Sequence, residues 1–324
     1  MKGVNCLSFL LFLGALLMVS CNKVVVEEPQ KEDTFTQVSF GFSGNEFLTS
    51  ETSLTRAGEA KDWYAFQVYS RAEGSNSSYS YYAYGFFDNK NDMVINLKNG
   101  YEYRFDVCMV VDASQRVYKF CLMNSGWAGI NNTFVISSTE YVRYMYEGYL
   151  YMNYPSYTSY NRPRVDRFMG RTDGYVPTEG GVVNIDMKRV AFAVRFAPKD
   201  FVSGSLEISI EDAGSMTMKA GTDTECQDFI SFKNTYSAMS AALKGNEYSE
   251  SIPINVVWIK DDGSRSPIAN EAVSFKRNVL TTVEFEVKES SASSTFNLSA
   301  NETMGNGDTV TIEGDGTNTG VNPN

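Results

Sequence analysis

The sequence predicts an all-β protein with two β-sandwich domains of roughly immunoglobulin size in tandem. Short runs of alternating apolar and polar residues, rich in β-branched and aromatic side chains, recur along most of the chain. Gly, Asp, Asn or Pro separate these runs, as turns between antiparallel strands require. A single helix-like stretch, 236–243, suggests a short crossover at most. The length of 324 residues suits two domains, although one large β domain remains an alternative.

The N-terminus reads as a bacterial lipoprotein signal. One Lys precedes an apolar run at 7–19, which ends at the small residue Ser20 before Cys21. The run is too short to span a membrane reliably, so it predicts a cleaved signal peptide. "MVSC" resembles a lipobox, and this resemblance implies cleavage after Ser20 and acylation of Cys21. Several acyl chains on one Cys would form a stable membrane anchor. The alternative is an ordinary signal peptide with a chance Cys.

The predicted organisation follows from changes of composition along the chain. Residues 22–37 are polar and charged, as in a flexible tether. The density of Arg, Pro and Gly up to 178–181 suggests a domain junction there. We therefore expect a signal peptide at 1–20, a tether at 21–37, an N-terminal β-sandwich domain at 38–178, a C-terminal β-sandwich domain at 179–289 and a polar tail with possible strands at 290–324.

In the N-terminal domain we expect strands at 38–42, 63–70, 81–87 and 94–97. The clearest local pattern is a hairpin at 101–123. Residues 101–111 alternate strictly and predict a half-buried strand, with 117–123 as its return strand. A turn centred between Ser114 and Gln115 places Cys108 opposite Cys121 on the polar face. Opposed Cβ atoms lie within closing distance of a disulfide, and an oxidising periplasm would favour one. The alternative is two thiols adjacent by accident. In either case Cys226 is left without a Cys partner, and we expect it to be buried as a small hydrophobic residue.

In the C-terminal domain seven short alternating segments predict the second sandwich. They lie at 182–198, 204–213, 215–220, 228–233, 251–260, 272–276 and 278–289. The polar tail contains two further strand-like segments, at 295–300 and 308–314. The last residues, 315–324, have the composition of disordered chain.

Composition excludes several functions. The chain has 28 basic and 39 acidic residues, a net charge of −11, so nothing suggests binding to nucleic acid or a polybasic membrane patch. It has no His, which excludes Ser-His-Asp and Cys-His pairs and His-ligated metal sites. Paired carboxylates remain formally open, yet no pair stands out. We therefore expect neither catalysis, nor a metal, nor a cofactor.

Tyrosines are concentrated at 141–160, which holds eight of the chain's 20. If 141–151 is extended, both faces are aromatic, and the residues beyond it have the composition of a loop. Tyr and Ser in loops provide rigid contact area at low entropic cost. This suggests a contact surface for a glycan or protein. The alternative is that the aromatics pack a domain edge. The candidate contact residues are Tyr149, Tyr151, Tyr154, Tyr157 and Tyr160.

Several motifs resemble the fimbrillin-type lipoproteins of Bacteroidales, the subunits and relatives of type V pili. "LTRAG" at 54–58 resembles the segment after their first strand, and "VDRFMGRTDG" at 165–174 resembles the segment before their domain junction. "DMKRVAFAVRFAP" at 186–198 and "FKRNVLTTVEFEV" at 275–287 resemble strands of their second domain. The resemblance implies two transthyretin-like β-sandwich domains on a lipid anchor at the outer membrane.

The resemblance also implies a mode of assembly. In pilus-forming members, cleavage after an Arg removes the first strand, and a C-terminal strand of the next subunit replaces it by β-augmentation. Here Arg56 is the matching cleavage site, 38–42 the released strand and 295–312 the candidate donor. The alternative for Arg56 is an ordinary loop Arg. "TMGNGD" interrupts the donor, which favours an anchor, tip or non-pilus relative. Thr309 matches an O-glycosylation motif of these bacteria.

Two functional hypotheses follow. The first is a surface-exposed outer-membrane lipoprotein that acts in adhesion or pilus assembly, with pilus subunits or a host protein as partners. The second is a lipid-anchored module that binds a glycan through its aromatic loop.

Overall fold

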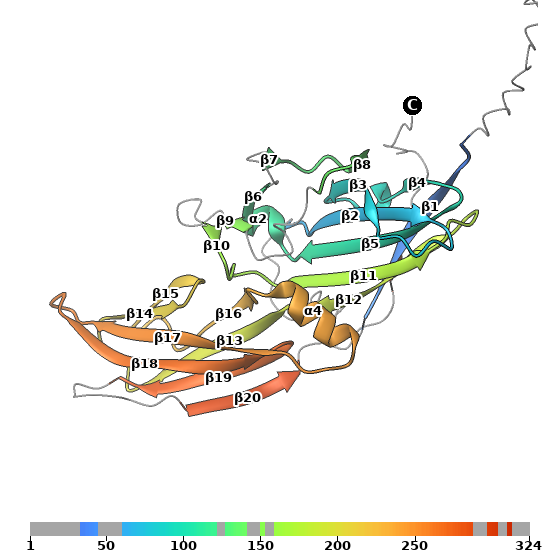
Figure 1. The fold of residues 1–324 in the computed structure, drawn as a ribbon. Coiled ribbons are helices and arrows are strands. Elements are labelled where there is room, and N and C mark those ends of the chain that lie inside the picture. Colours follow the sequence, from blue (N-terminus) through green and yellow to red (C-terminus); the bar gives the residue numbers. More distant parts are fainter. Residues whose placement is uncertain are drawn as a thin grey trace, which may run out of the picture. The chain divides into compact units, whose positions relative to one another are not determined.

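The computed structural model describes residues 33–44, 60–121, 127–140, 150–152, 159–287, 297–303 and 310–312. Nearly all of their regular structure is β-strand, so the all-β prediction is confirmed (Figure 1). The largest sheet holds nine strands in the described part of the chain, in the order β21-β1-β12-β11-β5-β2-β3-β8, with β4 paired to β1. Its strands are β1 (Phe35–Ser43), β2 (Trp63–Ala72), β3 (Ser80–Phe87), β4 (Ile95–Lys98), β5 (Tyr101–Val110), β8 (Thr133–Ile136), β11 (Arg167–Tyr175), β12 (Val182–Arg189) and β21 (Val310–Ile312).

Two four-stranded sheets follow in the second half of the chain, in the orders β16-β13-β19-β20 and β15-β14-β17-β18. Helix α4 (Thr235–Leu243) lies between β16 and β17 in sequence and contacts β11 and β12 of the large sheet. This helix is the crossover that the sequence predicts. The strands are β13 (Ala191–Lys199), β14 (Ser205–Ile210), β15 (Gly214–Lys219), β16 (Cys226–Ser231), β17 (Ser249–Ile259), β18 (Arg265–Lys276), β19 (Val279–Glu286) and β20 (Asn297–Thr303).

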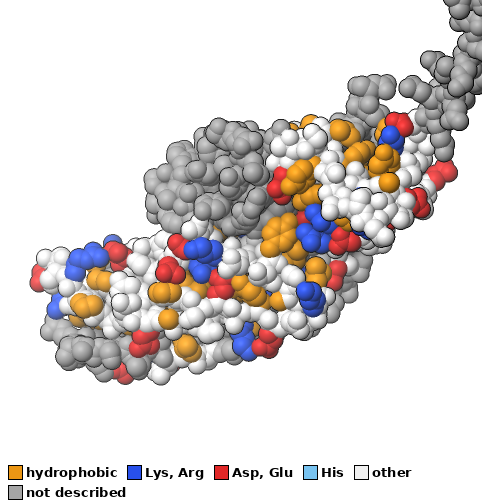
Figure 2. Space-filling model, in the orientation of Figure 1, with side chains coloured by type: hydrophobic (Ala, Val, Ile, Leu, Met, Phe, Trp, Pro, Cys, Tyr) orange, Lys and Arg blue, Asp and Glu red, His pale blue; other side chains and the backbone are white. Residues whose placement is uncertain are grey.

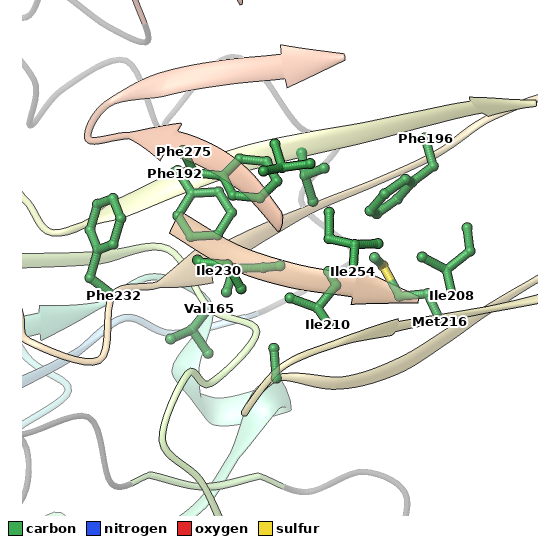
Figure 3. Packing of buried hydrophobic residues seen from close by; sticks show 14 of the residues in the cluster. Val165, Phe192, Phe196, Ile208, Ile210, Met216, Ile230, Phe232, Ile254 and Phe275 are labelled. Carbon is green, nitrogen blue, oxygen red and sulfur yellow. The ribbon is translucent and has the colours of Figure 1, made fainter. Parts of the chain in front are cut away.

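The core of the second half forms from the inward residues of these alternating strands. Phe192 of β13 stacks on Phe275 of β18 with ring centroids 4.3 Å apart, and Figure 3 shows aliphatic side chains filling the space beside them. Strand β14 has the burial pattern of a half-buried strand, with Leu206, Ile208 and Ile210 inside. This is the alternation from which the second sandwich was predicted.

The predicted junction at 178–181 falls inside the large sheet. Strand β12 follows that junction, yet it pairs with β1 and β11 of the large sheet. The chain passes to the smaller sheets after Arg189, and β13 begins two residues later, at Ala191. Strand β1 begins at Phe35, three residues before the predicted start of the first strand at 38. The division into two domains itself stays a prediction.

The predicted hairpin at 101–123 is wrong. Strand β5 pairs with β2 and β11, and Cys108 lies opposite Ala65 and Met169. Asp112 adopts a left-handed backbone conformation with φ 50°, and a single helical turn, α2 (Ala113–Arg116), follows. Strand β6 (Val117–Cys121) then pairs with β7 (Trp127–Ala128) and β9 (Leu150–Met152) in a separate sheet.

The disulfide itself stays a prediction, although the register that suggests it fails with the hairpin, because Cys108, fully buried in β5, lies opposite Ala65 and Met169. The backbone of Cys121 pairs with Trp127 instead. Strand β5 is also not half-buried as predicted. Asp106 and Cys108, on its expected polar face, are only 1% and 0% exposed. Other parts of the chain cover that face, which a local pattern could not reveal.

Candidate strand-exchange site

Strand β1 lies where three other strands meet. Its first half, Phe35–Val38, pairs antiparallel with β4. Its second half, Ser39–Ser43, pairs with β12 in parallel. Phe40–Phe42 also pair antiparallel with β21. Because one strand serves three neighbours, its removal would open both a β4 edge and a β12 edge.

The core face of β1 is entirely buried. Val38, Phe40 and Phe42 are at most 1% exposed. The ring of Phe40 lies 4.8 Å from that of Phe66 and 5.4 Å from that of Phe105. Phe42 stacks on Tyr64 at 5.6 Å. These aromatic contacts tie β1 to β2 and β5 across the core. The predicted strand 38–42 is therefore present and forms the centre of this site.

The opposite face of β1 is fitted closely to β12. A Cβ atom on Gly41 would come within 2.6 Å of Asn184 Oδ1, so a larger residue at this position would require the Asn184 side chain to move. Gly44 ends the strand with φ +136°, and a Cβ there would meet Met187 O at 2.3 Å. Thr36 anchors the other end by donating from Oγ1 to Asn99 Oδ1 at 2.8 Å. The position of Gly44 is therefore the one at which a replacement strand would need a glycine.

Arg56 falls in the connection between Ser43, the end of β1, and Trp63, the start of β2. Arg56 itself lies outside the described residues, as do Ser20, Cys21 and Thr309. Cleavage anywhere in this connection would separate β1 covalently from the rest of the fold. The position of the candidate cleavage site is thus compatible with release of β1.

The candidate donor segment, 295–312, contributes two separate strands. Strand β20 pairs antiparallel with β19 at the edge of a second-half sheet, and β21 pairs with β1. Both strand-like segments predicted in the tail are therefore strands. Residues 304–309 lie between them and outside the described part of the chain.

The candidate tyrosine surface is described only in part. Tyr151 lies in β9, and Tyr160 lies in β10 (Ser159–Tyr160). The two strands pair antiparallel, with Ser159 opposite Tyr151 and Tyr160 opposite Leu150. Tyr149, Tyr154 and Tyr157 lie outside the described residues. The expected loop is thus closed at its base by a short hairpin, and 153–158 form the connection between its strands.

A polar cluster on β5 was not predicted from the sequence. Asp106, 1% exposed, accepts two hydrogen bonds from Arg171 at 2.6 and 2.8 Å and one from the Tyr236 hydroxyl at 2.8 Å. The guanidinium carbon of Arg104 lies 3.7 Å from the ring centroid of Tyr69. We call these five residues the Asp106 cluster. The sequence signal that could have indicated it is the charged residue Asp106 within a strand whose other face is apolar.

The Asp106 cluster attaches helix α4 to the large sheet, and its tyrosines do not transfer protons. Burial and the charge of Asp106 raise the pKa of Tyr236 far above its usual value of 10, and they do the same to Tyr69. Both hydroxyls stay protonated at physiological pH, and that of Tyr236 donates a hydrogen bond to Asp106. Because Tyr236 belongs to α4, its bond to Asp106 holds this helix against the large sheet.

The rest of the described surface offers no clear catalytic constellation. Within the described residues, no group of three or more Cys, Asp or Glu side chains could hold a metal ion. No helix there is long and apolar enough to cross a membrane. On the face in Figure 2, hydrophobic side chains form small separate groups among charges of both signs.

No protein-family model and no curated protein match the sequence. The chain is similar to the solved structure of Mfa3, the tip fimbrial protein of Porphyromonas gingivalis, at 9% identity and a TM-score of 0.34, covering 82% of this chain and 100% of that one. It is similar to the fimbrial anchor protein Mfa2 of the same organism, at 9% identity and a TM-score of 0.35, covering 78% and 90%. A candidate polysaccharide-binding protein of Bacteroides thetaiotaomicron matches at 11% identity and a TM-score of 0.36, covering 83% and 98%. The solved structures that this chain resembles are thus fimbrial and adhesion-type proteins of these bacteria.

Proposed function

We propose that this chain is a non-catalytic, surface-exposed outer-membrane lipoprotein that acts in adhesion or pilus assembly through exchange of a β-strand between subunits. The observation that supports this most is the position of β1. One strand, joined to β2 by a connection that contains Arg56, fills a groove between β4, β12 and the aromatic core.

The free energy gained by burying β1 is so large that its release would require another strand to take its place. Burying each of Val38, Phe40 and Phe42 contributes about 1.5–3 kcal/mol, or about 5–9 kcal/mol together. A whole domain is stable by only about 5–15 kcal/mol. A protein that lost β1 without a substitute would therefore be close to unfolding. Cleavage after Arg56 would create a groove with a strong preference for an incoming apolar strand.

The tail is the candidate source of that strand, although its composition limits the role. The segment "TMGNGD" separates β20 from β21, so the tail offers two short strands instead of one long donor. This pattern favours an anchor or tip subunit over a repeating stalk subunit. Acylation of Cys21 would hold the uncleaved protein on the outer membrane, with cleavage of the signal peptide after Ser20.

Cleavage can be tested on the mature chain with an Arg-specific protease, followed by mass spectrometry and size-exclusion chromatography. We expect a cut after Arg56, with the β1 fragment remaining bound until a synthetic peptide of residues 295–312 displaces it. The Arg56→Lys variant is the matched control and should resist the same protease. A protein that stays uncut at Arg56, or a β1 fragment that the peptide never displaces, would refute strand exchange.

A second function, glycan binding, is favoured by the β9–β10 hairpin. This hairpin closes the base of a connection that contains Tyr154 and Tyr157. Tyr side chains in a loop supply rigid contact area at low entropic cost. A glycan array with the mature chain tests the idea, with Tyr154→Ala and Tyr157→Ala as variants and Tyr81→Ala, on β3, as the control. Binding that both loop variants retain unchanged would exclude this function.

A further inference from the structure

Two strand pairs in the described part of the chain are parallel, β1 with β12 and β13 with β19. In the first pair Ser39–Ser43 lie beside Val182–Asp186, at five paired positions. In the second pair Ala193–Lys199 lie beside Leu280–Glu286, at seven paired positions. Evenly spaced hydrogen bonds join parallel strands. The large sheet and one sheet of the second half of the chain therefore each contain one parallel pair.

The two parallel pairs follow one another directly along the chain. Strand β12 ends at Arg189 and β13 begins at Ala191, so one residue, Val190, connects them. Val190 is fully buried. Its N–H donates to Arg167 O at 2.8 Å, and its carbonyl accepts from the Phe232 N–H at 3.0 Å. A tensile force can therefore pass from β12 to β13 without first straightening a loop.

The N-terminal and C-terminal segments of the chain enter these pairs from opposite ends. The N-terminal segment reaches β1 at Phe35, and the tail leaves β19 at Glu286. A pull on both segments draws β1 backwards along β12, and it draws β19 forwards along β13. Both parallel pairs are then loaded in shear, so that all the hydrogen bonds of a pair are stretched together. A pair that is pulled open from one end loses its bonds one after another, at a lower force.

Backbone hydrogen bonds beyond the paired positions close the second parallel pair at both ends. The N–H of Asn278 donates to Ala191 O at 3.0 Å, and the N–H of Val287 donates to Lys199 O at 2.9 Å. In the first parallel pair, the buried aromatic face of β1 opposes sliding, because each step along β12 would pull its rings out of the core. Both pairs therefore resist shear by more than their paired positions alone.

We propose that the two parallel pairs act in series as a mechanical clamp, which resists tension between the N-terminal segment and the tail. The tail strands lie outside this clamp. Strand β20 runs back along β19, so a pull on its far end opens that pair from one end. A protein that is anchored at one end and holds a partner at the other experiences such tension. The inference takes from the proposed function only the two points at which the force enters.

The test is single-molecule force spectroscopy on the mature, uncleaved chain at constant force. In the first geometry the handles are attached to the two ends of the chain. In the first control one handle stays at the N-terminus and the other is on an azide-bearing residue in place of Glu179, which is exposed and precedes β12. In the second control the handles are at the C-terminus and in place of Val202, which is 86% exposed and follows β13. Each control opens one parallel pair from a single end.

We expect the unfolding lifetime at the same force to be at least about tenfold longer in the end-to-end geometry than in either control, because several bonds must break together. Urea unfolding should give equal stability for all three forms. A handle that lowers this stability is moved to the neighbouring exposed residue, Thr178 or Asp200.

An end-to-end lifetime no longer than that of the controls would overturn the proposal. The experiment uses one uncut chain with no partner. Its failure would therefore leave strand exchange at Arg56 untouched, and an absence of strand exchange would not change the measured lifetimes.

Discussion

Arg189 and Asp166 form an ion pair inside the protein, with Nε donating to Oδ1 at 2.9 Å and Nη2 to Oδ2 at 3.1 Å. The two side chains are 2% and 5% exposed. A third hydrogen bond joins Arg189 Nη1 to Asn278 Oδ1 at 2.6 Å. Arg189 ends β12, and Asn278 lies in the turn between β18 and β19. The cluster therefore links the large sheet to a turn of the second half of the chain.

Asp166→Ala should destabilise the protein by about 3–5 kcal/mol, because it leaves the Arg189 charge buried without its partner. Urea unfolding of the mature chain measures this change. Glu284→Ala removes the exposed partner of Lys199 and is the control, with no measurable effect expected. A loss below about 1 kcal/mol for Asp166→Ala would mean that water reaches the pair.

Tyr236→Phe should cost about 1.5–3 kcal/mol, because a charged acceptor, Asp106, loses one of its donors. Hydrogen exchange should accelerate in α4 more than in β17, since the lost bond fixes this helix on the large sheet. Tyr81→Phe removes an exposed bond to Glu140 and serves as the control. Unchanged protection of α4 in Tyr236→Phe would show that apolar packing alone holds the helix.

The ionised side chain of Glu250 should contribute to stability, and this contribution should be lost in acid. Burial opposes its ionisation, but hydrogen bonds from Tyr248 and Arg162 outweigh burial and lower its pKa below the usual 4.5. A lowered pKa in the folded state stabilises the protein above pH 4.5, and this stabilisation is lost as the pH falls. The difference in unfolding free energy between the natural chain and Glu250→Gln should therefore shrink from pH 6 to pH 3. A difference independent of pH would contradict this assignment.

Cys108 should be unreactive until the protein unfolds. It is fully buried, and burial raises the pKa of its thiol to about 11, so little thiolate exists at neutral pH. Maleimide labelling followed by peptide mass spectrometry should find Cys108 unmodified in the native protein and labelled in urea without reductant. Recovery of a Cys108–Cys121 disulfide would contradict this prediction, and it would favour the hairpin that the pairing of β5 with β2 and β11 excludes.

The sequence predicts most strands well where one face of the strand is exposed. Alternation identified β1, β14 and the strand-like segments of the tail, because each local pattern records which side chains point inward. At β5 it identified the strand but not its burial, because residues distant in sequence cover Asp106 and Cys108. The left-handed conformation at Asp112 also turns the chain away from β5, and the neighbouring residues contain no pattern that predicts this turn.

The candidate site was predictable to a similar degree. The strand at 38–42 and its burial could be inferred from local pattern, whereas its pairing with β4, β12 and β21 depends on contacts far apart in sequence. The Asp106 cluster joins three strands and a helix, so no single motif contains it. Arg56, Cys21 and the tyrosines at 149, 154 and 157 stay predictions.

The position at which the mature chain begins on the surface of cells tests the central claim, strand exchange, most directly. Surface protein is released, and its N-terminal peptide is identified by mass spectrometry. Strand exchange predicts a chain that begins at Ala57 in assembled material, with β1 absent. A chain that begins at an acylated Cys21 and is intact through Arg56 in all assembled material would contradict strand exchange, and would leave an anchored binding module.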